Sequence, residues 1–192
     1  MSTVGTRQLR SLVHAGDAIG RALEELQLTV GEGPCRDACA GGPVLVADLA
    51  AEFTRWPVFG PAAARLGVAA VFSFPLRRRA VRLGSLDLHR NRPGALTRQQ
   101  VADGLLLAGL ATQAVAGRLD GHDGAELTWP ADVHAEVHQA AGMVSVQLRT
   151  TTDAALLRLR GQAFLRGETL SCVAHQVVAR TLRFTPSGDT SG

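Results

Sequence analysis

The last third of the chain repeats its apolar residues with the period of an α-helix, and this pattern constrains the fold more than any other feature. Residues 170–182 follow an i, i+3, i+4, i+7, i+8 spacing that places the apolar side chains on one helical face. Residues 132–148 and 151–166 carry comparable stripes. Because no helix of this length buries its stripe alone, the sequence predicts one bundle of three helices over residues 132–184.

Residues that start and stop helices agree with these limits. Thr150 or Thr151 is suited to cap the second helix, and Gly167 is suited to the left-handed conformation that ends it. Residues 185–192 contain no apolar side chain to anchor them. We therefore expect a disordered tail after the third helix.

The chain ahead of this bundle has mixed periodicity. Residues 68–76 and 82–89 alternate as strands and are separated by an arginine-rich turn, which predicts an antiparallel hairpin. Helical spacing is clear at 17–28, where Asp17 is a candidate cap, and at 98–118. Shorter candidates are strands at 10–15 and 43–49 and a helix at 61–66. The fold class that this predicts is α+β, with a first domain over 1–118. A linker is expected over 119–131, where the composition changes to include two glycines, a proline and several acidic residues.

Composition excludes several classes of protein. Apolar residues make up 46% and charged residues 19%, which is typical of a globular chain. The most apolar stretch, 101–116, is interrupted by polar residues and is too short for a membrane span, and no secretory leader is recognised, so we expect a cytoplasmic protein with no membrane partner. The net charge of +3 is a mild indication of an anionic partner, and the absence of lysine points to a GC-rich genome.

The three cysteines predict reduced thiols, because an odd set without an export signal is not a disulfide framework. Cys35 and Cys39, four residues apart, are compatible with a redox or metal pair. No histidine or second cysteine pair lies at zinc-site spacing nearby, so structural thiols are the favoured interpretation. We expect neither a metal nor a cofactor.

The first half resembles the GAF domains of actinobacterial regulators. The resemblance rests on LEELQLTVGEGPC at 23–35, PVLVADL, the triplet RWP at 55–57, FPL and LGSLDLHR. It implies a six-stranded or similar antiparallel sheet with helices around a small-molecule pocket. Too few residues precede Thr6 for the first helix and strand of that family, so we expect either a missing edge element or an earlier start. Four aromatic residues are pocket candidates, although core packing is the more conservative interpretation: Phe53, Trp56, Phe72 and Phe74.

The second half resembles the ANTAR module over VHQAAGMVSVQL at 137–148, ALLRLR at 155–160 and LSCVAHQVVAR at 170–180. This resemblance implies binding to paired RNA hairpin loops that prevents a transcription terminator from forming. The RNA-binding candidates are small residues or cations: Ala140, Gly142, Arg149, Arg158, Arg160, Arg166 and Arg180. The basic residue usual in the family is replaced by Ala141, and the usual asparagine by Gly167, and both changes lower the expected RNA affinity.

The function predicted from these patterns is a signal-responsive regulator of transcription antitermination that binds RNA. No nucleophile elbow, phosphate loop or catalytic carboxylate pair is present, so we do not expect an enzyme. The alternative is a sensor or scaffold whose helical module binds a protein. A homodimer is expected through the helix at 98–118, which has more apolar surface than one sheet needs.

Overall fold

The computed structural model describes residues 16–119, 133–185 and 190–191, which divide into two compact units. The first unit contains the described residues from 33 to 119, and the second joins residues 16–32 to the described residues from 133 onward. Helices and a three-stranded antiparallel sheet make the described chain an α+β protein, as the sequence predicts. None of its helices combines the length and apolar content needed to cross a bilayer.

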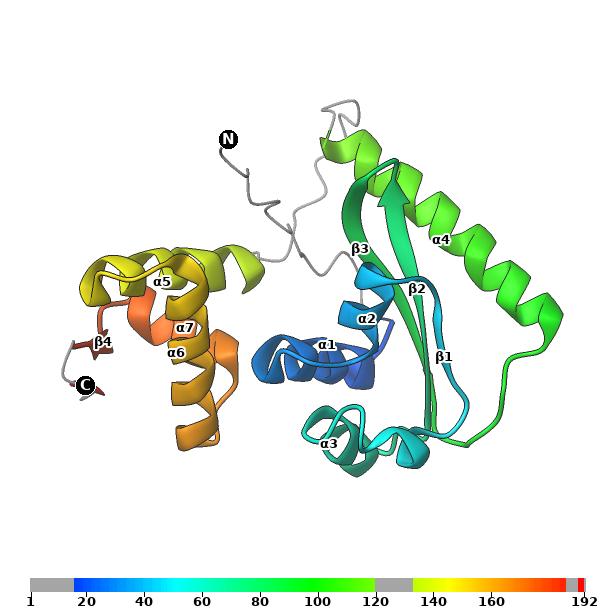
Figure 1. Cartoon of the computed structure of the whole chain (residues 1–192), viewed down its shortest axis with the longest axis horizontal. Coiled ribbons are helices and arrows are strands. Elements are labelled where there is room, and N and C mark those ends of the chain that lie inside the picture. The colour runs from blue at the N-terminus through cyan, green and yellow to red at the C-terminus, as the bar shows by residue number, and fades with distance from the viewer. Residues whose placement is uncertain (1–15, 120–132, 186–189, 192) are drawn as a thin grey trace. The chain divides into compact units, whose positions relative to one another are not determined.

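The sheet of the first unit is built around the predicted hairpin. Its strands are ordered β1, β2, β3 and all neighbours are antiparallel (Figure 1). Their bounds are Val44–Val46 for β1, Ala70–Arg78 for β2 and Val81–Arg90 for β3. The register sets Phe72 opposite Leu88 and Phe74 opposite Leu86. The described part of this sheet therefore has three strands, fewer than the resemblance implies.

Helices cover both faces of this sheet. α4 (Arg98–Leu119) lies along one face, where Phe72 and Phe74 are buried. The short helix α2 (Pro34–Ala40) lies on the other, and the guanidinium of Arg77 on β2 donates to three carbonyls at its C-terminal end. A 3₁₀ turn, η1 (Leu49–Glu52), and α3 (Phe59–Arg65) lie between β1 and β2 in the chain. Apart from η1 and α2, each of these elements overlaps a predicted one.

The three C-terminal helices form where the apolar stripes predict them. Their bounds are Val133–Leu148 for α5, Thr152–Arg166 for α6 and Leu170–Val178 for α7. Of the two candidate caps, Thr151 is the one used: its hydroxyl accepts from the N–H of Ala154 at 3.2 Å. Gly167 ends α6 with a φ of 63°. The stripes meet in one core that includes Val144, Leu159 and Val177, so these helices share it as predicted.

The second unit also contains a fourth helix, α1 (Ala18–Val30), which the sequence analysis assigns to the N-terminal domain. Asp17 caps this helix as predicted, by accepting from the N–H of Gly20 at 2.7 Å. Leu28 of α1 belongs to the same buried cluster as the three C-terminal helices. The boundary between the units therefore differs from the expected one, because an apolar stripe indicates that a helix packs but not which core it packs against.

Two short strands end the described chain. β4 (Arg183–Phe184) pairs with β5 (Thr190–Ser191), although the sequence predicts a disordered tail from residue 185. The side chain of Phe184 is buried in the helical core, and its backbone pairs with Thr190 of β5. The predicted strand at 10–15 and nearly all of the linker at 119–131 lie outside the described residues.

Candidate functional site

The two small residues proposed for RNA contact on α5 occupy different surroundings. Ala140 is completely buried in the core of the second unit, so its methyl group packs between helices and does not reach the surface. Gly142 is partly exposed, and a methyl group built on it would meet no atom within 4 Å. Of the pair, Gly142 alone leaves open space next to the backbone of α5.

Two of the predicted cations lie at one end of the second unit. Arg149 follows the last turn of α5 and Arg180 follows α7, and both have positive φ angles, 51° and 61°. The side-chain carbonyl of Gln147 accepts from the N–H of Phe184 at 2.9 Å, which ties the segment after α7 to the last turn of α5. Arg183 is exposed on this same segment. We call Arg149, Arg180 and Arg183 the cationic end.

The other three predicted cations lie along α6. Arg166 is in the last turn of the helix and donates to Gln176 at 3.0 Å. The start of α6, beside Arg149, is roughly 20 Å away at 1.5 Å per residue. Arg158 is exposed in the middle of the helix, whereas the Nε of Arg160 donates to the carbonyl of Leu28 on α1 at 3.2 Å. The structure thus places one of the predicted contacts against another helix.

An exposed apolar stripe on α6 was not expected from the sequence. Phe164 is 75% exposed and Leu165 is 81% exposed, and Leu157 lies on the same outward arc at 68%. Gly161 between them has open space around it. Phe164 was not expected at the surface because large aromatic side chains are usually buried. The buried stripe that includes Leu159 occupies the other side of the helix.

The four aromatic candidates for a ligand pocket belong to separate packing groups. Phe72 and Phe74 are buried between β2 and α4. Trp56 is buried against Phe59, with the rings edge to face at 5.8 Å, and its Nε1 donates to Asp37 of α2 at 3.2 Å. Phe53 packs on Gly60, where an added methyl group would lie 2.7 Å from the ring. Three of these side chains are thus buried in the first unit, whereas Phe53 is only partly buried.

Cys35 and Cys39 are both buried free thiols on α2. The thiol of Cys39 donates to the carbonyl of Gly84 on β3 at 3.3 Å, so this side chain joins α2 to the sheet. The same helix is joined to the loop after η1 by Arg55, whose guanidinium is 2.8 Å from the carboxylate of Asp37. The thiol of Cys39 therefore packs inside the unit.

Comparisons with known proteins add no family to this geometry. A scan of protein-family models found no match to the chain, and searches of curated proteins and of solved structures found none either.

Proposed function

We propose that the chain is a signal-responsive regulator whose helical unit binds RNA, and that it is not an enzyme. The observation that carries the proposal is the cationic end. It places Arg149, Arg180 and Arg183 at one exposed end of a unit that has an extensive apolar core. Proteins bind the phosphates of RNA through cations of this kind. The resemblance to ANTAR modules implies that the bound RNA consists of paired hairpin loops. Antitermination of transcription is the activity that this resemblance implies.

The first unit supplies the sensing part of this proposal. Its sheet, covered by helices on both faces, is compatible with the GAF resemblance, and an unidentified small molecule is the proposed signal. Regulators of this kind act on nascent transcripts, which are made in the cytoplasm of bacteria. The proposal therefore places the protein in the cytoplasm. No residue is assigned to a catalytic role.

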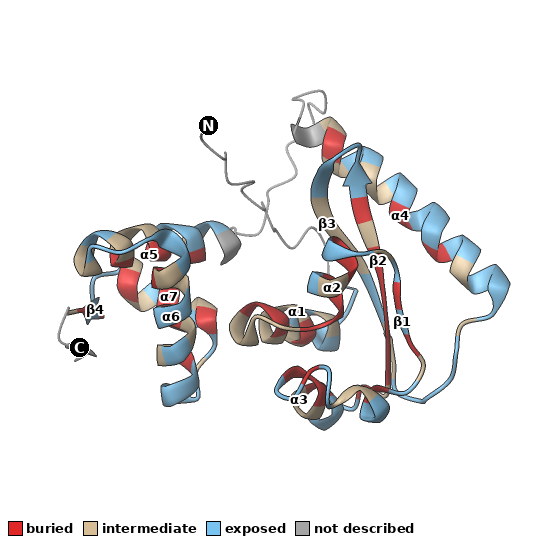
Figure 2. Ribbon diagram, in the orientation of Figure 1, coloured by how far each residue is buried: buried red, intermediate tan, exposed pale blue. Residues whose placement is uncertain are grey.

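A homodimer through α4 is part of the same proposal. Much of the surface of α4 away from the sheet is exposed (Figure 2). Small residues such as Gly104 and Ala108 face the sheet, whereas Leu106 is 66% exposed. Between Leu105 and Gly117 the sequence contains no charged residue. An uncharged apolar helix face is suited to a two-fold contact, because the same surface serves both copies.

The second candidate function is binding of a protein partner by the helical unit. The exposed stripe of Leu157, Phe164 and Leu165 on α6 favours it, because large apolar side chains at the centre of an interface carry much of the energy of protein association. Under this alternative the cationic end is a solvated surface.

The test is an electrophoretic shift of a two-hairpin leader RNA across a salt series, with Arg149→Asn, Arg180→Asn and the double variant. Asparagine removes the cation but tolerates a positive φ, so the helix ends are preserved. We expect each change to weaken binding by about 1 kcal/mol and the double variant to reduce the salt dependence by about two phosphate contacts.

Arg92→Gln is the matched control, since it removes one cation from an exposed loop of the first unit. It is expected to bind as the unaltered chain does. A folded protein that gives no shift at micromolar concentration would exclude the RNA proposal and favour the protein-binding alternative.

A further inference from the structure

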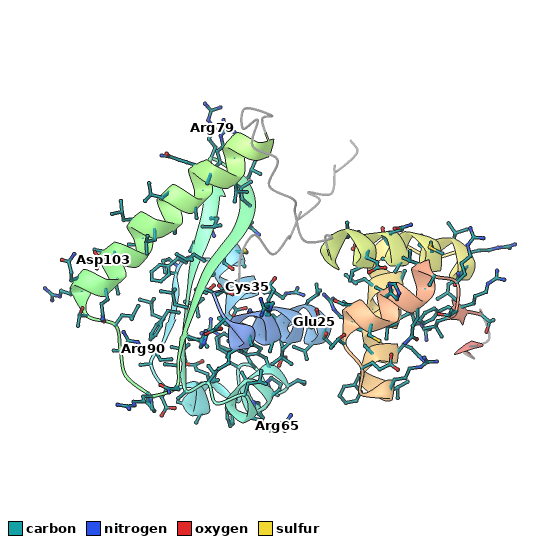
Figure 3. The ribbon with its side chains drawn as sticks, turned by 180° about the vertical axis from the view of Figure 1, so that it is seen from behind. Glu25, Cys35, Arg65, Arg79, Arg90 and Asp103 are labelled. Carbon is teal, nitrogen blue, oxygen red and sulfur yellow. The ribbon has the colours of Figure 1, made fainter. Side chains whose placement is uncertain are left out.

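The first helix, α1, is attached to the start of α7 by specific hydrogen bonds. The carboxylate of Glu25 accepts from the N–H of Ser171 at 3.1 Å and from its hydroxyl at 2.7 Å. The hydroxyl of Thr29 accepts from the N–H of Leu170 at 2.9 Å. Figure 3 shows Glu25 where α1 reaches this part of the helical unit. The N–H groups of a first helical turn have no partner within their own helix, so α1 supplies two of the acceptors that α7 needs.

The same helix covers one of the cations on α6. The carbonyl of Leu28 on α1 accepts from the Nε of Arg160. The helix is followed by its C-cap residue, Gly31, whose φ is 73°. A methyl group added to Gly31 would lie 3.1 Å from the guanidinium carbon of Arg160. Arg160 is partly buried, and its guanidinium is packed against the end of α1, where its Nε is already engaged by the Leu28 carbonyl.

The charges of the two parts of this unit are opposite. Residues 16–32 carry four carboxylates and one arginine, whereas residues 133–185 carry six arginines and three carboxylates. An acidic helix on a cationic module repels the phosphates that the module would bind. The helix therefore acts against RNA both by covering Arg160 and by its charge.

The chain also connects α1 directly to the other unit. Gly31, Glu32 and Gly33 are the whole link between α1 and α2, which begins at Pro34 in the first unit. Two glycines in a three-residue link permit the backbone changes that a shift of α1 requires. This link is the covalent route by which a change of conformation in the first unit would reach α1.

We infer that α1 is a displaceable inhibitory helix, which masks Arg160 and lowers the RNA affinity of the helical unit until it is released. This inference rests on the proposed RNA-binding function and adds its regulation. Thr29→Val and Glu25→Gln test it in the full chain, because each weakens attachment to α7. Thr29→Val does so without altering charge.

Two measurements are made on each variant: hydrogen exchange of the α1 amides, and the Kd for the two-hairpin leader RNA. Loss of a hydrogen bond to a charged group shifts the equilibrium between attached and released α1 by roughly tenfold. The apparent RNA affinity rises with the fraction of protein in which α1 is released. We therefore expect faster exchange in α1 with protected α5 to α7 and, for Glu25→Gln, RNA binding about tenfold tighter. For Thr29→Val we expect a smaller gain, about threefold, since its hydroxyl is neutral.

Asp153→Asn is the control for charge, because it removes one carboxylate from the exposed start of α6 and leaves α1 attached. It is expected to change neither exchange in α1 nor the Kd by more than about twofold. Faster exchange in α1 with unchanged or weaker RNA binding would overturn the inference and make α1 a supporting helix. Absence of RNA binding in the unaltered chain and in every variant would instead refute the proposed function, and the inhibitory role with it.

Discussion

Two glycines of α4 differ only in what lies beside them. A methyl group at Gly104 would fall 2.5 Å from the ring of Phe74, which is fully buried, whereas one at Gly109 would meet nothing within 4 Å. Close approach of α4 to the sheet thus depends on the missing side chain at the first position and not at the second. The two residues form an internal comparison on one helix.

Gly104→Ala is expected to lower the free energy of unfolding of the first unit by about 2 kcal/mol, because the buried Phe74 ring must shift to admit the methyl group. Gly109→Ala is the control and is expected to raise stability by up to about 1 kcal/mol, from the helix propensity of alanine. Urea unfolding followed by circular dichroism measures both. Equal effects at the two positions would contradict the packing of α4 described above.

At the scale of elements, the helical unit shows how caps set helix limits. Two threonines precede α6, and the sequence allowed either to be the cap. The structure selects Thr151, and Thr169 plays the same part for α7 by accepting from the N–H of Cys172 at 3.2 Å. Each cap satisfies a backbone donor that the helix leaves without a partner.

Thr151→Ala is expected to lower the free energy of unfolding of the helical unit by about 1 kcal/mol, since Ala154 loses its acceptor. Thr150→Ala changes an exposed neighbour of the same type and is expected to have an effect within about 0.5 kcal/mol. Thermal and urea unfolding of the two variants are compared. A larger loss at position 150 would assign the cap to the other threonine.

At the scale of the whole molecule, the exposed leucines of α4 bear on how copies of the chain associate. Leu106 and Leu110 stand on the outward side of a helix whose inward side is already occupied by the sheet. An exposed apolar patch of this kind is more stable when another surface covers it. The proposed two-fold contact would cover it without any additional partner.

Leu106→Glu combined with Leu110→Glu is expected to convert a dimer to a monomer, because the contact would bring like charges together in an apolar interface. Sedimentation equilibrium or native mass spectrometry reports the mass. Val146→Glu is the control, since it places the same charge at an exposed apolar position on α5. A monomer in the unaltered chain, or a dimer that persists in the double variant, would refute the contact through α4.

Local pattern was sufficient for the elements that bury one clear face. The 68–76 and 82–89 runs became β2 and β3, and the three C-terminal stripes became helices with a common core. Alternation and helical spacing determine such elements because each buried residue recurs at the period of its own backbone. Helix α2 was not predicted, because its seven residues are too few to show a helical period; Pro34 occupies its first position, where proline is compatible with a helix start.

What only the tertiary structure decided is which surfaces meet. The sequence by itself determined an α+β chain with a helical C-terminal bundle and a cationic surface, since periodicity and charge are local properties. It did not determine that α1 joins that bundle, that Ala140 is buried, that Arg160 contacts Leu28 or that Phe164 faces outward. These depend on contacts between residues as far as 146 positions apart. An apolar stripe is attracted to any apolar partner of matching shape.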